Sequence, residues 1–408
     1  MDLTPGLRRE PGPDLDAVGQ DDELAGRIHG EIERTGPITF ARFMELALYD
    51  PTGGYYRGAA ARPGREGDFL TAPETHPIFG AALARGLVEI WDRLGRPDPF
   101  VLREYGAGTG SLAVAILAGL ESDRSPLAAR LRYDPIEVEP RRLETIAAHL
   151  AAAGRTDVLV EPDTGRPPMH GVVLANEVLD ALPTHRVVAR DGALRELLVR
   201  SRDGRFEDVE AEPSTLALAD RLHAEGISLV NGQRAEICLA LEPWIAAAAA
   251  GLGRGLLLLI DYGYPASELY DPIRRRGGTL RAYLRQRVHD VPYRHVGRQD
   301  LTAHVDVTAV ESAAARAALG HLGTTTQAEF LVGLGAQDLL QAIQSDPATT
   351  LEDYLAVRSA VMRLLDPGAM GRFRVMGFGR DWPPGPPLGG FAYRLVPERT
   401  KPHQTPTD

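Results

Sequence analysis

The chain of 408 residues contains one cysteine, Cys238. A single cysteine excludes an internal disulfide and a metal site made of several thiolates, and it is typical of a reducing compartment. The longest apolar runs, such as LLLLI at 256–260, are too short to cross a bilayer. The N-terminal stretch 1–26 has no apolar core and carries acids, so it fits neither a signal peptide nor a mitochondrial transit sequence. We therefore expect a cytoplasmic protein without a membrane span.

The formal net charge is −11, with 56 acidic and 45 basic residues. Nucleic-acid binding depends mainly on Lys and Arg that neutralise phosphates, so this balance argues against a nucleic-acid partner. The 11 histidines are scattered and form no close cluster with acids at the spacing of metal ligands, which argues against a catalytic metal. The length allows two to three domains, but no internal repeat or low-complexity linker divides the chain. One integrated fold is expected.

Both ends of the chain, 1–22 and 397–408, are polar and rich in proline, and we interpret them as disordered tails. Between them, residues 23–98 show helical spacing of apolar residues and predict an N-terminal helical cap. Two runs carry this pattern: Phe40, Phe43, Met44, Ala47 and Leu48, with Thr39 as the helix N-cap, and then Leu83, Leu87, Ile90, Trp91 and Leu94.

After Pro99 the pattern changes to short β-rich runs, FVLRE, PIEV, VLV and VVLAN, and helical periodicity separates the first three. This alternation predicts an α/β fold with a doubly wound, Rossmann-like parallel sheet in 99–396. Two Asp-Gly pairs between strand-like runs predict a small antiparallel meander within an insertion at 184–254. The sheet is expected to resume with GLLLLIDYGY and to close with RFRVMGFG and FAYRLV.

The motif EYGAGTG, 104–110, follows the first sheet strand and precedes the helical run SLAVAILAGL. Glycines at this turn let a ligand approach the backbone and let the helix pack on the sheet. The spacing of Glu104, Gly106, Gly108 and Gly110 differs from the dinucleotide fingerprint, because Ser111 stands where a third glycine would fall. It resembles the cofactor motif of class I S-adenosylmethionine methyltransferases. A merely tight strand-to-helix turn is the alternative.

The next strand ends in IEVEP, and an acid at the carboxyl end of this strand is placed to accept hydrogen bonds from ribose hydroxyls. Glu137 is our candidate, and Glu139 is its rival. A solvated acid at the strand end is the alternative without function. The carboxyl ends of parallel strands open on one crevice, so Glu104, Glu137 and Asn176-Glu177 should converge there.

The fourth strand ends in ANEVLDALPTHR, which places Asn176, Glu177 and Asp180 where a class I methyltransferase holds its acceptor. The Asn-Pro-Pro-aromatic sequence of many nucleic-acid amine methyltransferases is missing. Carboxylates suit a cationic acceptor, and the planar guanidinium of arginine matches a carboxylate pair. The acids would orient one nitrogen and take its proton as the new bond forms. In the alternative, Glu177 caps the helix that follows and Asp180 is an ordinary surface residue.

Ordered motifs along the chain resemble the MidA-like family, which is related to the mitochondrial complex I assembly factor 7 protein arginine methyltransferase. The resemblance spans about 36–379, and its motifs are GPITFARFMELALYDPTGGYY, GDFLTAPETHPIFG, EYGAGTG, ANEVLDALPTHR, LLLIDYGY, GTLRAY, DLTAHVD and TQAEFL. It implies a class I methyltransferase fold, S-adenosyl-L-methionine as cofactor, and methylation of a protein arginine. A respiratory complex I subunit is the implied candidate partner. The chain departs from the family at Gln286, where the family has histidine, and at Glu139-Pro140, where it has Ser-Pro, so the acceptor site is expected to differ.

Three of these motifs contain further candidate residues. Asp68 and Thr71 of GDFLTAPE would help to close the cofactor site. In the alternative, Phe69 packs into the core and Thr71 caps a helix. Asp261 and Tyr262 end the fifth strand, where they would face the acceptor or simply pack. His304 of DLTAHVD is a candidate proton acceptor because an unperturbed histidine has a pKa near 6.5.

Two other functions stay open from the sequence. A small-molecule methyltransferase would close the insertion at 184–254 over a compact pocket. A respiratory-complex assembly factor would bind S-adenosylmethionine and a partner with little turnover. The oligomeric state is not predicted.

Overall fold

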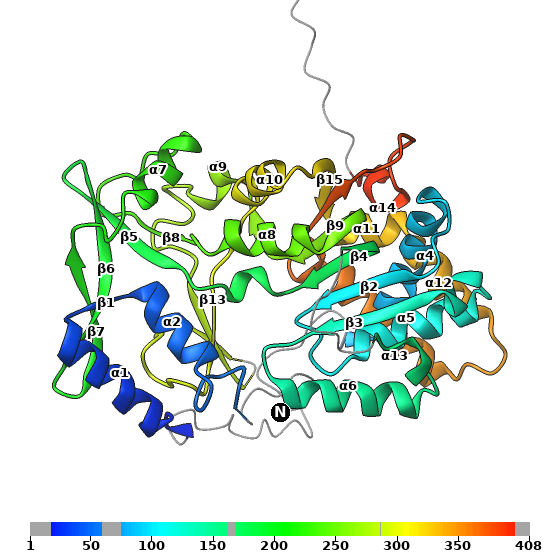
Figure 1. Cartoon of the computed structure of the whole chain (residues 1–408), viewed down its shortest axis with the longest axis horizontal. Coiled ribbons are helices and arrows are strands. Elements are labelled where there is room, and N and C mark those ends of the chain that lie inside the picture. Colours follow the sequence, from blue (N-terminus) through cyan, green and yellow to red (C-terminus); the bar gives the residue numbers. More distant parts are fainter. Residues whose placement is uncertain (1–17, 59–74, 161–167, 286, 396–408) are drawn as a thin grey trace, which may run out of the picture.

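The computed structural model describes residues 18–58, 75–160, 168–285 and 287–395, and these form two lobes (Figure 1). The larger lobe contains a six-stranded sheet in the order β15-β16-β9-β4-β2-β3. Strands β9, β4, β2 and β3 are parallel, and β16 is antiparallel to both of its neighbours. The strands are β2 (Phe100–Tyr105), β3 (Leu131–Ile136), β4 (Met169–Asn176), β9 (Leu252–Asp261), β15 (Gly320–Thr326) and β16 (Arg374–Arg380). The predicted doubly wound α/β sheet is confirmed.

Both faces of this sheet are buried, which explains the continuous apolar run in β9. Leu256 and Leu258 lie in one core and Leu257 and Leu259 in the other, because successive side chains of a strand point to opposite faces. The first core includes residues of α4 (Ile78–Arg93), α5 (Ser111–Ser122), α6 (Pro140–Ala152), α11 (Gln327–Gly333), α12 (Ala336–Ser345), α13 (Leu351–Leu365) and α14 (Gly389–Ala392). The second core includes residues of α8 (Leu241–Ala250) and α10 (Val307–Arg316).

The smaller lobe is built around a second, antiparallel sheet in the order β1-β6-β5-β8, with β7 paired to β6. Its strands are β1 (Ile38–Thr39), β5 (His185–Arg190), β6 (Ala193–Arg202), β7 (Arg205–Ala211) and β8 (Arg234–Ile237). The predicted meander is therefore present, and it interrupts the main sheet between β4 and β9. A separate three-stranded sheet consists of β11 (Arg281–Leu284), β12 (Arg287–His289) and β13 (Asp300–Thr302), and β10 (Gly263–Tyr264) pairs with β14 (Val305–Asp306).

The helices of 23–98 are divided between the two lobes instead of forming one layer. Helices α1 (Asp22–Thr35) and α2 (Phe40–Tyr49) share a core with residues of β6, β7 and β11, whereas α4 packs on the main sheet. Thr39 caps α2 as predicted, because its side chain accepts a hydrogen bond from the Arg42 N–H at 3.1 Å. Helices α7 (Ala217–Ala224) and α9 (Ala266–Leu269) supply a further core of the smaller lobe. The domain boundaries themselves stay a prediction.

The predicted closing strand FAYRLV is wrong. Its described residues begin in α14, and the Phe391 ring lies against Gly323 and Gly377, where an added Cβ would meet the ring at 2.8 and 2.6 Å. Strand β15, GHLGTTT, takes the edge position instead. The predicted strand VLV is reduced to the 3₁₀ turn η3 (Thr156–Val158) and one bridge between Leu159 and Tyr133. The remaining 3₁₀ turns are η2 (Pro126–Ala129), η4 (Leu179–Ala181) and η5 (Met370–Arg372).

Within the described ranges, no helix combines the length and apolar character needed to span a bilayer. The same part of the chain holds no group of three or more His, Cys, Asp or Glu side chains able to bind a metal ion.

Candidate active site

A cavity of about 300 Å³ lies at the carboxyl edge of β2, β3 and β4. The cavity is lined by the glycine turn, by the ends of the three strands and by residues of several other segments, among them η4 and α8. The lining residues are Tyr49, Tyr56, Glu104, Tyr105, Gly106, Ala107, Gly108, Thr109, Ser111, Leu112, Ile136, Glu137, Val138, Arg142, Asn176, Glu177, Val178, Ala181, Leu182 and Trp244. The predicted convergence of strand ends on one crevice is therefore present in the structure.

The glycine turn adopts a backbone that requires glycine. Gly106, Gly108 and Gly110 have φ values of 69°, 59° and 78°, in the left-handed region that L side chains rarely adopt. A Cβ on Gly106 would lie 2.7 Å from a methyl group of Val178, whereas a Cβ on Gly108 would meet only the Gly106 carbonyl oxygen, at 4.0 Å. The turn thus leaves open space beside Gly108, and that space belongs to the cavity.

Glu104 is buried at the end of β2, with 3% of its surface exposed. Its Oε2 accepts a hydrogen bond from the Tyr133 hydroxyl at 2.6 Å. Burial raises the pKa of Glu104 to about 8, the Tyr133 hydrogen bond opposes this rise, and the nearby Glu137 adds to it. Glu104 is therefore mostly protonated at neutral pH in the folded protein.

This raised pKa predicts a pH-dependent stability. The unfolded chain ionises Glu104 near its ordinary pKa of 4.5, whereas the folded chain retains the proton until about pH 8. The raised pKa therefore adds a term to the free energy of unfolding, on the order of a few kcal/mol. This term is complete below pH 4.5 and is lost as pH rises to about 8. Glu104→Gln should unfold with a weaker pH dependence than the parent between pH 5 and 8 in urea titrations. Parallel curves for the two proteins would contradict the raised pKa.

The structure distinguishes the two acids after β3. Glu137 lines the cavity, and its Oε1 accepts the Gly108 N–H at 2.5 Å. Burial raises the pKa of Glu137, and Arg142, at 3.8 Å, opposes that rise. Glu139 instead caps α6 and forms an ion pair with Arg141 at 2.7 Å. The geometry favours Glu137 over Glu139 as the acid that faces a ligand.

The end of β4 places Asn176 and Glu177 on the cavity wall. Glu177 has a φ of 53°, an uncommon conformation for a residue with a side chain and one that tends to occur at functional sites. The Asn176 amide donates to Glu177 Oε1 at 3.2 Å. The other amide atom, Asn176 Oδ1, is buried and has no hydrogen-bond partner among the described residues. It is therefore a buried acceptor without a partner, on a residue that lines the cavity.

Asp180 lies in η4, is not among the residues that line this cavity, and is only 5% exposed. Its carboxylate is hydrogen-bonded by Tyr262, and burial raises the pKa of Asp180 to about 6. The turn that carries Asp180 is held by Asp261, whose Oδ2 accepts the N–H groups of Val178, Leu179 and Asp180 at 3.2, 2.8 and 3.3 Å. Asp261 therefore fixes the turn, a structural role that the sequence left open.

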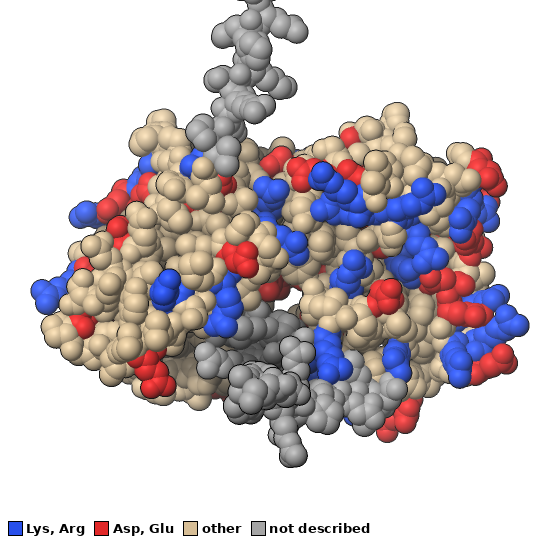
Figure 2. Space-filling view, turned by 180° about the vertical axis from the view of Figure 1, so that it is seen from behind, with Lys and Arg blue, Asp and Glu red and all other residues tan. Residues whose placement is uncertain are grey.

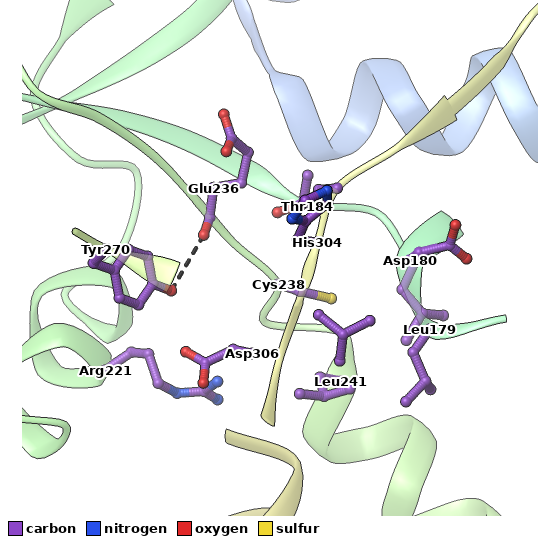
Figure 3. A pocket seen from close by; sticks show the side chains of 13 residues that line it. Leu179, Asp180, Thr184, Arg221, Glu236, Cys238, Leu241, Tyr270, His304 and Asp306 are labelled. Atoms are coloured by element: carbon purple, nitrogen blue, oxygen red, sulfur yellow. Dashed lines mark hydrogen bonds between the residues drawn. The ribbon is translucent and has the colours of Figure 1, made fainter. Parts of the chain in front are cut away.

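A second, smaller cavity of about 20 Å³, enough for one water molecule, lies beside η4. Figure 3 shows Asp180 at one side of it and Asp306 beside Arg221 at the other. His304 lines this cavity and not the larger one. Burial and nearby arginines lower the pKa of His304 to about 4, so its ring is neutral at physiological pH.

Two tyrosines from the smaller lobe line the larger cavity, and neither is among the site residues predicted from the sequence. The rings of Tyr49 and Tyr56 stack at 5.5 Å and 25°. The Tyr49 hydroxyl donates to the Ala181 carbonyl at 2.9 Å, and the Tyr56 hydroxyl donates to Asp300 Oδ1 at 2.8 Å. The signal for them was the aromatic-rich GPITFARFMELALYDPTGGYY motif, although nothing local indicates which cavity these rings reach. Asp68, Thr71 and Gln286 lie outside the described residues.

Residues 82–325 match the family model of S-adenosyl-L-methionine-dependent methyltransferases. This segment is more than half of the chain and contains the glycine turn and the end of β4. The chain belongs to this methyltransferase family.

Solved structures and curated proteins agree with that membership. The chain is 35% identical to a Burkholderia thailandensis protein whose crystal structure contains S-adenosyl-homocysteine, with a TM-score of 0.82 over 94% of this chain and 97% of that one. It is 28% identical to the Drosophila melanogaster protein arginine methyltransferase NDUFAF7 homolog, mitochondrial, over 90% of this chain and 87% of that protein. It is also 28% identical to human protein arginine methyltransferase NDUFAF7, mitochondrial, over 77% and 73%. The class I methyltransferase fold, the MidA-like resemblance and S-adenosyl-L-methionine as cofactor are confirmed.

The predicted cytoplasmic location is contradicted. The curated relatives from Drosophila melanogaster, Danio rerio and Homo sapiens are all named as mitochondrial proteins. The prediction was wrong because it depended on the absence of signal-peptide and transit-sequence features from the N-terminal stretch. The absence of such features is weak evidence for a subcellular location.

The residues around the larger cavity fit the cofactor. The space beside Gly108 admits a ligand close to the backbone, and Glu137 supplies a carboxylate at the adjacent strand end. When bound, S-adenosyl-L-methionine supplies an electrophilic methyl group on a sulfonium.

Proposed function

We propose that this methyltransferase modifies arginine side chains of a partner protein. The observation that carries the proposal is Asp180, a carboxylate that is 5% exposed and forms no ion pair with Lys or Arg in the described part of the chain. Burying a carboxylate without a cation is costly, so the site is suited to a cation supplied by the acceptor. The residues that follow Asp180, Ala181 and Leu182, line the cofactor cavity, so this acid lies close to where the acceptor must be held.

The guanidinium of arginine fits this arrangement better than a point-charge ammonium, because its planar fork of N–H donors can engage two acids at once. We assign Glu177 and Asp180 to that fork, and Asn176 Oδ1 to a further N–H of the same group. These side chains orient one nitrogen, and a carboxylate takes the proton that the nitrogen loses as its bond to carbon forms. Glu104, Gly106, Gly108, Gly110 and Glu137 are assigned to holding the cofactor.

The names of the relatives support the same acceptor. The Drosophila melanogaster and human proteins are both named protein arginine methyltransferases. Their identity to this chain is 28%, so the assignment to this chain depends on its own acids as well.

The proposal is tested by the destination of the methyl group. The purified protein is incubated with methyl-labelled S-adenosyl-L-methionine and a cell extract that lacks it, and label is then measured in protein, RNA and small molecules. We expect label in one or a few proteins. Label confined to small molecules would contradict the proposal, as would cofactor binding without any transfer.

A further inference from the structure

The segment that follows α2 turns back on the helix and brings two tyrosines together. The Gly54 N–H donates to the Asp50 carbonyl at 3.0 Å, and a Cβ on Gly54 would lie 2.4 Å from the Asp50 nitrogen, so this turn needs glycine. Tyr56 then lies alongside the end of α2, because its N–H donates to the Leu48 carbonyl at 2.9 Å. Its ring stacks on that of Tyr49, the last residue of the helix. We call Tyr49 and Tyr56 the tyrosine pair.

The hydroxyl groups of the tyrosine pair are bonded to segments beyond the end of β4. The Tyr49 hydroxyl donates to the carbonyl of Ala181 at 2.9 Å, in η4, the turn that carries Asp180. The Tyr56 hydroxyl donates at 2.8 Å to Asp300, the first residue of β13, and β13 packs against η4. The pair is therefore attached to the side of the cavity where the acceptor must be held.

The surface that the tyrosine pair leaves toward the cavity is that of its rings. Each hydroxyl has one hydrogen to donate, and both hydrogens are used. Tyr49 and Tyr56 are half-buried, and both line the cavity. Tyr56 also packs edge-on against the fully buried Tyr55, with ring centroids 5.1 Å apart. The two rings thus form a fixed aromatic wall.

This wall belongs to the smaller lobe, whereas the glycine turn and the end of β4 belong to the larger one. In Figure 2 the surface is hollowed between the two lobes. The cavity therefore combines aromatic surface from one lobe with the carboxylate of Glu177 from the other. Aromatic faces and carboxylates both attract cations, and the delocalised guanidinium of arginine stacks on aromatic rings.

We propose that the tyrosine pair is the surface on which the acceptor guanidinium lies, and that it determines the preference for this group. The N–H groups of a guanidinium lie in its plane, so a ring can cover its face while Glu177 accepts from its edge. An ammonium directs its three N–H groups around a tetrahedron and has no flat face to stack. The adenine of the cofactor is the rival occupant, but the bonds of the pair to η4 and β13 favour the acceptor. This inference rests on the proposed function, whose specificity it assigns to two residues.

The test compares two small cations on protein saturated with S-adenosyl-homocysteine. Ethylguanidinium carries the planar group, propylammonium does not, and ligand-observed NMR titration gives the Kd of each. We expect the parent to prefer ethylguanidinium, and we expect this preference to fall about tenfold in Tyr56→Leu, which removes the ring. Tyr56→Phe keeps the ring and loses only the bond to Asp300, so its preference should stay within about threefold of the parent.

Methyl transfer checks the same claim during turnover. With labelled S-adenosyl-L-methionine and a cell extract that lacks the protein, Tyr56→Leu should form methylarginine about tenfold more slowly than the parent. Its affinity for S-adenosyl-L-methionine, measured by calorimetry, should change by less than about threefold. The matched control is Tyr393→Leu, at an exposed position beyond α14, which should equal the parent in every assay. If Tyr56→Leu does not fold, Tyr49→Leu carries the same test.

An unchanged preference in Tyr56→Leu, together with formation of methylarginine, would reject this role of the tyrosine pair and leave the proposed function standing. An equal loss of preference in Tyr56→Phe and Tyr56→Leu would also reject it, because the hydroxyl bond and not the ring would then matter. A large loss of cofactor affinity with an unchanged preference would assign the ring to the adenine. A preference that depends on the ring, without any methylarginine, would support the pair and reject arginine as the methylated residue.

Discussion

Glu177→Gln should lower the rate of methyl transfer about 10²- to 10³-fold and change the affinity for S-adenosyl-L-methionine by less than about threefold. Glutamine keeps the size of the side chain and its contact with the Asn176 amide, which donates at 3.2 Å in the parent. It removes the charge that orients a guanidinium and accepts a proton. Single-turnover transfer measures the first effect, and calorimetry with S-adenosyl-L-methionine measures the second.

The matched control for this variant is Glu139→Gln. Glu139 comes from the neighbouring strand end, caps α6 and forms an exposed ion pair with Arg141, so its loss should leave transfer close to the parent rate. Full activity in Glu177→Gln would remove the acid pair from the mechanism. A large loss of cofactor affinity in the same variant would instead move Glu177 to the cofactor side of the cavity.

Gly108→Val should weaken binding of S-adenosyl-L-methionine by more than about 100-fold, which corresponds to at least about 2.7 kcal/mol. The backbone of Gly108 has a φ of 59°, and its N–H donates to Glu137 Oε1 at 2.5 Å. A side chain at this position points into the open part of the cavity, where only the Gly106 carbonyl oxygen is within 4.0 Å. Valine would therefore occupy space that the cofactor needs.

Backbone strain must be separated from this steric effect. Gly154, beyond the end of α6, has a φ of 70° and nothing within 4 Å of an added Cβ, so Gly154→Val carries a similar strain away from the cavity. We expect both variants to lose a similar amount of thermal stability, with only Gly108→Val losing the cofactor. Equal cofactor affinity in the two variants, measured by calorimetry, would contradict the placement of the cofactor.

The cofactor half of the site could be predicted from the sequence because its signals are local. The glycines of EYGAGTG and the acid at the end of the next strand are each read within a few residues, and parallel strands bring their carboxyl ends together. The choice between Glu137 and Glu139 needed the structure, since both belong to the same short run. What separates them is that one faces the cavity and the other caps α6.

The acceptor half depends on contacts that no local pattern encodes. Tyr56 and Asp300 are 244 residues apart and join through a 2.8 Å hydrogen bond. The edge strand β15 was not predicted because GHLGTTT has little alternation of apolar and polar residues. FAYRLV was predicted as a strand from its apolar residues, but Phe391 is apolar because its ring packs against two glycines of the sheet.

The chemical identity of the methylated residue tests the central claim most directly. Protein labelled from methyl-labelled S-adenosyl-L-methionine is hydrolysed in acid and its amino acids are separated, with Glu177→Gln as the parallel sample. We predict that the label is recovered as methylarginine and that it is nearly absent from the Glu177→Gln sample. Label recovered as methyllysine, or released by mild alkali as from a carboxyl methyl ester, would contradict arginine as the acceptor.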